Sequence, residues 1–332
     1  MVFFPQSAQE AAKFALAACV GFTGLKLAGV AIRFLRYIYA HLLMPRRDLA
    51  ARYGLIDSTP ARSYIVVTGA NNEGIAYVFA QEFAAKGFSI ALVGHTADTN
   101  GETKLLAVAA KLQEWAAGKG HSIQVMPIAI ASLGNVGAAN DSAIPAIVKA
   151  LEGVDVAGIV HGAGILTIGK FDGNSMEQNR TILAVNAMAP VLITQALLPK
   201  LTARVASGAS PRSALILIGS SLGLRASGHG MNLYSATKAL VNFFGQSTSM
   251  EFEGSLDVLT AHPCIVSTTL LPMPVNGISV ITPQQCARAC LSKIGTFYVR
   301  HSWTNGYFTH ELLWWLALSV PRVLYQKVLG KY

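Results

Sequence analysis

Charged side chains are scarce in this chain of 332 residues. Only 13% of the residues are Asp, Glu, Lys or Arg, whereas 52% are hydrophobic. A typical soluble domain carries about 25% charged residues. Because disordered proteins combine few apolar residues with high net charge, this composition excludes a disordered chain. The length allows one large domain or two ordinary ones, with enough apolar material to bury a core.

Acidic residues are the scarcer sign of charge. The chain has 17 Asp and Glu against 26 Lys and Arg, a formal net charge of +9. More than half of this excess lies at or before Arg62. The rest of the chain has no basic run interleaved with aromatic residues, so the sequence does not predict nucleic-acid binding. A chain that is both apolar and basic instead indicates a membrane surface.

Cysteine is also rare. The four cysteines are Cys19, Cys264, Cys286 and Cys290. None forms a CxxC pair or a Cys/His spacing typical of metal sites, so no metal is expected. Reduced core thiols in a non-oxidising compartment are the simplest interpretation.

One long apolar run lies near the N-terminus. Residues 14–32 read FALAACVGFTGLKLAGVAI, and 19 helical residues span about 28 Å, close to the bilayer core. Lys26 interrupts the run toward one end, where it can snorkel. The run is followed by two tyrosines and a basic cluster: Tyr37, Tyr39, Arg33, Arg36, Arg46 and Arg47. This order predicts a membrane anchor over residues 1–44, with the arginine side in the cytoplasm or matrix. A helix lying in the membrane interface and a soluble docking helix remain alternatives.

The rest of the chain alternates short apolar, β-branched runs with helical periodicity. Strands are predicted at residues 64–68, 89–93, 123–130, 156–160, 214–218 and 256–261. Helices are predicted at 75–86, 105–115, 181–201 and 234–252, while prolines between residues 258 and 287 argue against a helix there. The alternation predicts an α/β fold with a doubly wound, Rossmann-type parallel sheet. We expect a linker at 45–62, this domain at 63–275, and an aromatic-rich helical extension at 276–332 that faces a membrane or a partner.

A glycine turn joins the first predicted strand to the first helix. It reads TGANNEGIA from Thr68 to Ala76. Glycines here let the backbone approach a pyrophosphate, and the helix N-terminus then faces the negative charge. We therefore expect a dinucleotide to contact Thr68, Gly69, Asn71, Gly74 and Ile75. A tight turn without a ligand is the alternative interpretation.

The end of the second strand bears on the choice of cofactor. An acid at this point binds the ribose hydroxyls of NAD(H). Here the sequence is Gly94-His95-Thr96, with no immediate acid, so NADP(H) is favoured over NAD(H). His95 would lie near a 2′-phosphate or be a solvated loop residue.

Tyrosine and lysine share one face of a later predicted helix. Tyr234 and Lys238 are at positions i and i+4. A nearby ammonium stabilises a phenolate, so we expect Lys238 to lower the pKa of Tyr234 from about 10. Tyr234 can then act as general acid to a carbonyl oxygen that receives a hydride. Ser221, thirteen residues before Tyr234, could hold the same carbonyl.

Together these motifs resemble the short-chain dehydrogenase/reductase family over about residues 64–269. The resemblance implies Tyr234 as acid/base, Lys238 as pKa shifter and ribose ligand, and Ser221 as carbonyl-orienting residue. It implies that Asn186, on the preceding long helix, completes a proton relay. It further implies cofactor contacts from Gly162, Ala163, Gly164 and Thr268.

The C-terminal region narrows the resemblance. The motif Thr304-Asn305-Gly306-Tyr307 and the later residues His310, Pro321, Tyr325 and Lys327 are similar to very-long-chain 3-oxoacyl-CoA reductases and 17β-hydroxysteroid dehydrogenases of types 3 and 12. The resemblance implies NADPH-dependent reduction of a ketone on a long-chain 3-oxoacyl-CoA or a steroid-like lipid. It also implies fatty acid elongation at the endoplasmic reticulum membrane.

Four residues, at three places in the sequence, depart from the family pattern. Ala76 replaces the last glycine of the turn, Ala131 replaces an aspartate that contacts adenine, and His161-Gly162 replaces two asparagines. All three changes fall on cofactor binding. They leave open a catalytically relaxed subunit of a larger membrane complex, such as a respiratory complex of the mitochondrial inner membrane.

Overall fold

The computed structural model describes residues 7–56, 62–70, 74–95, 101–138, 141–225, 230–296 and 303–320. It divides into two compact units, Met1–Arg46 and Arg47–Tyr332. Each unit is described by itself.

The N-terminal unit is a long apolar helix. Ser7 caps α1 (Ala8–Ile38) by accepting from the Glu10 backbone N–H at 3.2 Å, and the π-helical segment η1 (Tyr39–Leu43) continues it. The run Ala8–Leu43 is long and apolar enough to cross a membrane. Its exposed apolar side chains include Phe14, Leu16, Val20, Phe22 and Leu25. These positions fall on several sides of the helix, so its exposed apolar surface is not confined to one face.

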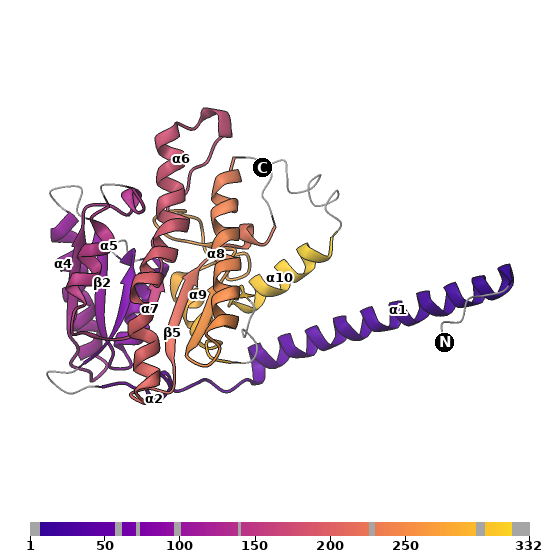
Figure 1. Cartoon of the computed structure of the whole chain (residues 1–332), viewed down its shortest axis with the longest axis horizontal. Coiled ribbons are helices and arrows are strands. Elements are labelled where there is room, and N and C mark those ends of the chain that lie inside the picture. Colours follow the sequence, from indigo (N-terminus) through magenta and orange to yellow (C-terminus); the bar gives the residue numbers. More distant parts are fainter. Residues whose placement is uncertain are drawn as a thin grey trace. The chain divides into compact units, whose positions relative to one another are not determined.

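The second unit is built on one parallel sheet (Figure 1). Its strands, in spatial order, are β3 (Val125–Ile130), β2 (Ser89–His95), β1 (Ser63–Thr68), β4 (Asp155–His161), β5 (Ser213–Ile218), β6 (Leu256–Ala261) and β9 (Trp303–Thr304). The order reverses direction between β1 and β4, which is the usual position of a ligand crevice in doubly wound sheets.

Helices cover both faces of the sheet. One core cluster joins α3 (Ile75–Ala84), α4 (Gly101–Ala117) and α9 (Pro283–Leu291) to the sheet. The other joins α5 (Ala143–Ala150), α7 (Ala189–Ala206) and α8 (Asn232–Glu251) to the opposite face. Along β1, Ile65 and Val67 belong to the first cluster, and Tyr64 and Val66 to the second. Burial on both faces explains why this strand reads as a continuous apolar run.

The doubly wound α/β fold is therefore confirmed, with two differences. The prediction of no helix between residues 258 and 287 was wrong at its end, where α9 begins. Pro283 is the first residue of α9, a position that needs no N–H, and Thr282 and Gln285 form a capping box in front of it. The sheet also continues past residue 275, because β9 pairs with β6. Nearby, α10 (Phe308–Ser319) completes the described part of the C-terminal region.

Arg204 holds the amino end of the sheet together. Its side chain is 3% exposed and its Nε donates to Oδ1 of Asp155 at 2.7 Å. The same guanidinium donates to the backbone carbonyls of Tyr53 and Gly54, just after the short helix α2 (Leu49–Arg52).

Asp257 lies at this amino end as well, and it accepts from two arginines. Arg52 donates Nη2 at 2.9 Å, and Arg212 donates Nε at 3.2 Å. The carboxylate is buried, with 4% of its side chain exposed. We call the five residues Arg52, Asp155, Arg204, Arg212 and Asp257 the amino-end charge cluster.

Candidate active site

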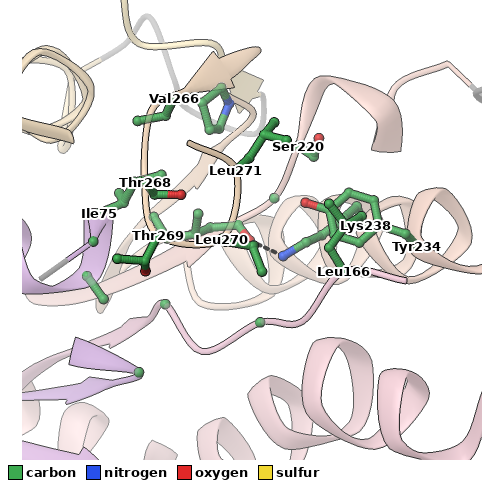
Figure 2. Close-up of a pocket in the computed structure, with 18 of the residues that line it drawn as sticks. Ile75, Leu166, Ser220, Tyr234, Lys238, Val266, Thr268, Thr269, Leu270 and Leu271 are labelled. Carbon is green, nitrogen blue, oxygen red and sulfur yellow. Dashed lines mark hydrogen bonds between the residues drawn. The ribbon is translucent and has the colours of Figure 1, made fainter. Parts of the chain in front are cut away.

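A cavity of about 430 Å³ opens at the carboxyl ends of β1, β4 and β5 (Figure 2). Ser220, Lys238 and Tyr234 lie toward one end of it, and Ile75, Thr268 and Thr269 toward the other. Lys238 is the only charged residue among its described lining. The lining consists of Gly69, Gly74, Ile75, Ala76, Gly162, Gly164, Leu166, Ile218, Gly219, Ser220, Tyr234, Lys238, Pro263, Cys264, Val266, Thr268, Thr269, Leu270 and Leu271.

Glycines form part of the lining of this cavity, and we call Gly69, Gly74, Gly162 and Gly164 the glycine floor. Gly69 has φ +77°, and a Cβ there would lie 2.5 Å from Cα of Ala163. The Oγ1 of Thr68 accepts from the N–H of Ala163 at 3.3 Å, which ties the ends of β1 and β4 together. Gly74 precedes α3 and has no side chain to cap it, and among the described residues no side chain caps the first N–H groups of this helix, a position that suits an anion. These features fit the pyrophosphate of a dinucleotide. Asn71 lies outside the described residues.

Two departures from the family pattern compensate each other. Ala76 is 2% exposed, and its Cβ lies only 2.4 Å from the point where a Cβ on Gly162 would be. The methyl group that Ala76 adds therefore occupies space that Gly162 leaves empty. The pair preserves close packing between α3 and the end of β4, so Ala76 by itself is no sign of a lost cofactor site.

The other two departures lie away from the cavity lining. His161 is buried, and its Nε2 lies 2.8 Å from Oγ1 of Thr194 on α7. Burial lowers the pKa of His161 to about 3, so the ring is a neutral tie between sheet and helix. Ala131 is exposed after β3. His95, at the end of β2, is exposed and does not line the cavity.

Asn186 shapes the cavity through the backbone. It lies in the π-helical segment η5 (Ala184–Met188), between α6 (Met176–Leu183) and α7. Its Oδ1 accepts from the N–H of Ile165 at 2.8 Å, and its Nδ2 donates to the carbonyl of the same residue at 2.9 Å. It thus fixes the segment that follows Gly164, a lining residue.

Tyr234 and Lys238 both line the cavity from α8, as their spacing predicted. The Nζ of Lys238 donates to the carbonyl of Ile218 at 2.8 Å and lies 5.6 Å from the centroid of the Tyr234 ring. Burial lowers the pKa of Lys238 to about 8. Burial also raises the pKa of Tyr234, and a hydrogen bond with the Ser220 side chain lowers it only in part. The pKa of Tyr234 is therefore raised overall, opposite to the expected lowering.

The serine that faces Tyr234 differs from the predicted one. Ser220 lines the cavity, whereas Ser221 does not, and the Ser221 side chain interacts with the thiol of Cys264. The Ser220 backbone is extended, with φ −161° and ψ 152°, and side chains alternate in direction along an extended chain. The sequence signal, a serine doublet thirteen and fourteen residues before the tyrosine, does not distinguish the two.

The remaining wall of the cavity is uncharged and, apart from Thr268 and Thr269, mostly apolar. Thr268 lies in the lining, as expected, at the start of a tight turn in which it exchanges backbone hydrogen bonds with Leu271. Leu166 and Leu270 belong to the same lining, and Leu270 remains 50% exposed. Sequence reasoning missed these leucines. The absence of charge from residues 258–287 is the one signal that could have indicated an apolar wall.

Known proteins resemble this chain in sequence and in fold. The sequence matches the short chain dehydrogenase family over residues 63–274. It is 29% identical to a very-long-chain 3-oxoacyl-CoA reductase of Caenorhabditis elegans, over 93% of this chain and 91% of that protein. It is 25% identical to very-long-chain 3-oxoacyl-CoA reductase-B of Danio rerio, over 84% and 81% of the two chains.

Solved structures show the same fold. A short-chain dehydrogenase from Sphingobium yanoikuyae in complex with NADPH superposes with a TM-score of 0.58 at 22% identity, covering 73% of this chain and 86% of that one. A 7β-hydroxysteroid dehydrogenase gives 0.64 at 19% identity, covering 81% and 97%. The family match spans well over half of the chain. The chain therefore belongs to the short-chain dehydrogenase family and is an NAD(P)-dependent oxidoreductase.

Proposed function

We propose that this protein reduces the 3-oxo group of a long-chain acyl-CoA to a hydroxyl group, with NADPH as reductant. The observation that carries the proposal is the meeting of Tyr234, Lys238 and Ser220 with the glycine floor in one cavity. The names of the relatives in Caenorhabditis elegans and Danio rerio support this substrate class.

The chain's own residues divide the work of ketone reduction. When bound, the nicotinamide cofactor supplies the hydride. Tyr234 donates its phenolic proton to the carbonyl oxygen as the negative charge develops there. The hydroxyl of Ser220 holds the same oxygen in place, a role that the family resemblance assigned to Ser221. Burial of the reacting groups limits access of water.

Lys238 and the glycine floor would hold the cofactor. A buried ammonium without a carboxylate partner among the described residues is a strong donor for ribose hydroxyls. Thr68, Gly69, Gly74 and Ile75 would contact the pyrophosphate, and Thr268 the nicotinamide end. Asn186 positions the backbone beside Gly164 and so belongs to the same assembly. The absence of an acid at residues 94–96 favours NADP(H).

The apolar wall supports a lipid-like substrate. Leu166, Leu270 and Leu271 present hydrocarbon to the cavity, and no charged residue lies between positions 258 and 287. An acyl chain would bury apolar surface against this wall, at about 25 cal/mol per Å².

We further propose that residues 1–44 anchor the protein in the endoplasmic reticulum membrane. The helical run Ala8–Leu43 has the length and composition of a spanning helix. The arginines that follow the apolar run favour a cytoplasmic orientation for the reductase unit. Fluorescence microscopy of the tagged full-length chain, with protease protection of the tag, tests both statements.

The experiment for the proposed reaction uses full-length protein in nanodiscs. We expect NADPH oxidation with 3-oxoacyl-CoA substrates, faster for long chains than for short ones, and slower with NADH. Turnover with steroid ketones but not with 3-oxoacyl-CoA would overturn the substrate class. No turnover with any ketone would instead favour a structural subunit of a membrane complex.

A further inference from the structure

His262 is a fully buried histidine directly behind the candidate active site, and the steps above do not use it. It follows β6. Its Nδ1 lies 2.7 Å from the carbonyl oxygen of Ser220 and 3.2 Å from the Ser220 nitrogen. Its Nε2 lies 3.1 Å from Oδ1 of Asn242 on α8. One ring thus contacts both elements that carry the catalytic groups, the Ser220 turn and the helix of Tyr234.

The position of this ring is fixed by its surroundings. A Cβ on Gly219 would lie 2.6 Å from two atoms of the ring, so the imidazole fills the space that this glycine leaves. The backbone N–H of His262 donates to the carbonyl of Thr304 at 2.8 Å, and Asn305 donates its side-chain amide to the His262 carbonyl. Thr304 and Asn305 are both completely buried. The C-terminal segment therefore holds His262, and His262 contacts the active-site turn.

The ring is neutral under ordinary conditions. Burial, and to a smaller extent the nearby Lys238 ammonium, lower the pKa of His262 to about 4, although the hydrogen bond with the Ser220 backbone acts to raise it. A neutral imidazole has one N–H and one lone pair, which suits one contact as donor and one as acceptor. It can bridge two polar groups without placing a second cation beside Lys238.

We propose that His262 is a positioning residue that holds the Ser220 turn against α8, so that the hydroxyl of Ser220, and not that of Ser221, faces Tyr234. Ser220 has an extended backbone and Ser221 begins the 3₁₀ turn η6 (Ser221–Gly223), and their hydroxyls have different partners, Tyr234 and Cys264. A rotation of this backbone would exchange them. The contact from His262 to the Ser220 backbone prevents this exchange. The proposal rests on the proposed ketone reduction.

Three substitutions separate positioning from packing. The amide of His262→Asn can reach the place of Nδ1 and retain the Ser220 contact. The amide of His262→Gln reaches the place of Nε2, and His262→Leu makes neither contact. We expect kcat to fall about 30-fold in the Leu and Gln variants, with KM for NADPH within about twofold of wild type. His262→Asn should keep kcat within about threefold of wild type.

A double-mutant cycle with Ser220→Ala completes the test. If His262 acts through Ser220, adding His262→Leu to Ser220→Ala should lower kcat by no more than about twofold. The full 30-fold loss in that background, or equal kcat in the Asn and Leu variants, would overturn the proposal. Rates are expressed per NADPH-binding site. If the Leu variant does not fold, the difference in kcat between the Asn and Gln variants tests the proposal. A wild-type protein without ketone turnover would defeat the proposed function itself, which separates that failure from this one.

Discussion

Charged side chains are paired at one end of the parallel sheet, whereas the other end has a lysine whose described hydrogen bond involves no carboxylate. At the amino ends of the strands, the amino-end charge cluster pairs both of its carboxylates with arginine: Asp155 with Arg204, and Asp257 with Arg52 and Arg212. At the carboxyl ends, Lys238 is the only charged group in the described lining of the cavity. Its described hydrogen bond goes to a backbone carbonyl.

This difference separates structural charge from functional charge. Paired and buried ions hold segments together, and their loss is expected to lower stability. A buried ammonium without a carboxylate keeps its charge for a ligand, at a desolvation cost that the rest of the fold offsets. Substitutions at the two ends should therefore change different measurements.

The largest expected effect is on catalysis at the carboxyl end. Tyr234→Phe removes the only proposed proton donor, so kcat should fall by about a thousandfold. Because the ring remains, NADPH affinity and the thermal unfolding midpoint should stay at wild-type values. Steady-state kinetics and a fluorescence titration with NADPH measure both. A Phe variant with more than a tenth of wild-type kcat would show that the tyrosine is not the acid.

At the amino end, Arg204→Met should lower the free energy of unfolding by about 3 kcal/mol, because it removes the partner of a partly buried carboxylate and of two backbone carbonyls. The activity of the folded protein should not change. Arg212→Met is the matched control, since Asp257 keeps Arg52 and the loss should be below about 1 kcal/mol. Denaturant unfolding measures the free energy of unfolding of both variants. A loss of activity without a loss of stability would contradict the assignment of a structural role to the amino-end charge cluster.

The two serines provide a more local test. Ser220→Ala should lower kcat by about 100-fold, because a hydroxyl directed at the reacting oxygen is lost. Ser221→Ala should cost less than about threefold, since that side chain faces Cys264. Parallel kinetics of the two variants give the answer. The reverse ranking would restore the assignment made by sequence spacing alone.

The paired substitution in the glycine floor predicts a rescue. Gly162→Ala should weaken NADPH binding by about tenfold, because the new Cβ would lie 2.4 Å from that of Ala76. Adding Ala76→Gly should recover part of the loss, while contacts of 3.1–3.2 Å to the Thr68 carbonyl and the Ala76 Cα remain. Calorimetric titration with NADPH compares the variants. Additive losses would mean that the two positions do not compensate each other.

The smallest effect is a pH dependence at the carboxyl end. The free enzyme should lose cofactor affinity as pH rises through about 8, where Lys238 loses its proton and its charge. Burial causes this lowered pKa, so the charged form dominates below that pH and disappears above it. The pH profile of kcat/KM should show this alkaline limb, and NADPH affinity of Lys238→Met should lack it. A profile that stays flat to about pH 10 would show that the deprotonation of Lys238 does not limit cofactor binding.

Much of this fold follows from local sequence patterns. Strands such as β1 were predictable because burial on both faces requires a continuous apolar run. Tyr234 and Lys238 were found because helical spacing places them on one face. The features that were missed depend on tertiary contacts. The two-residue strand β9 forms only because β6 has a free edge, and α9 begins at a proline that resembles a helix breaker in isolation.

The active-site serine shows most clearly what sequence patterns alone do not predict. Spacing favours Ser221, whereas the backbone of the turn presents Ser220 to the cavity. That orientation depends on His262, which lies more than forty positions away in the sequence. Likewise, Ala76 looks like a defect in the cofactor turn until its contact with Gly162 is seen.

Transfer of a label tests the central claim most directly, namely that the cavity at the carboxyl end reduces a ketone with Tyr234 as acid. Full-length protein in nanodiscs would be incubated with a long-chain 3-oxoacyl-CoA and NADPH carrying deuterium at the transferred position. We predict a 3-hydroxyacyl-CoA product one mass unit heavier at carbon 3, formed by the wild type and lost in Tyr234→Phe. Unlabelled product, or equal labelled product from both proteins, would contradict the account.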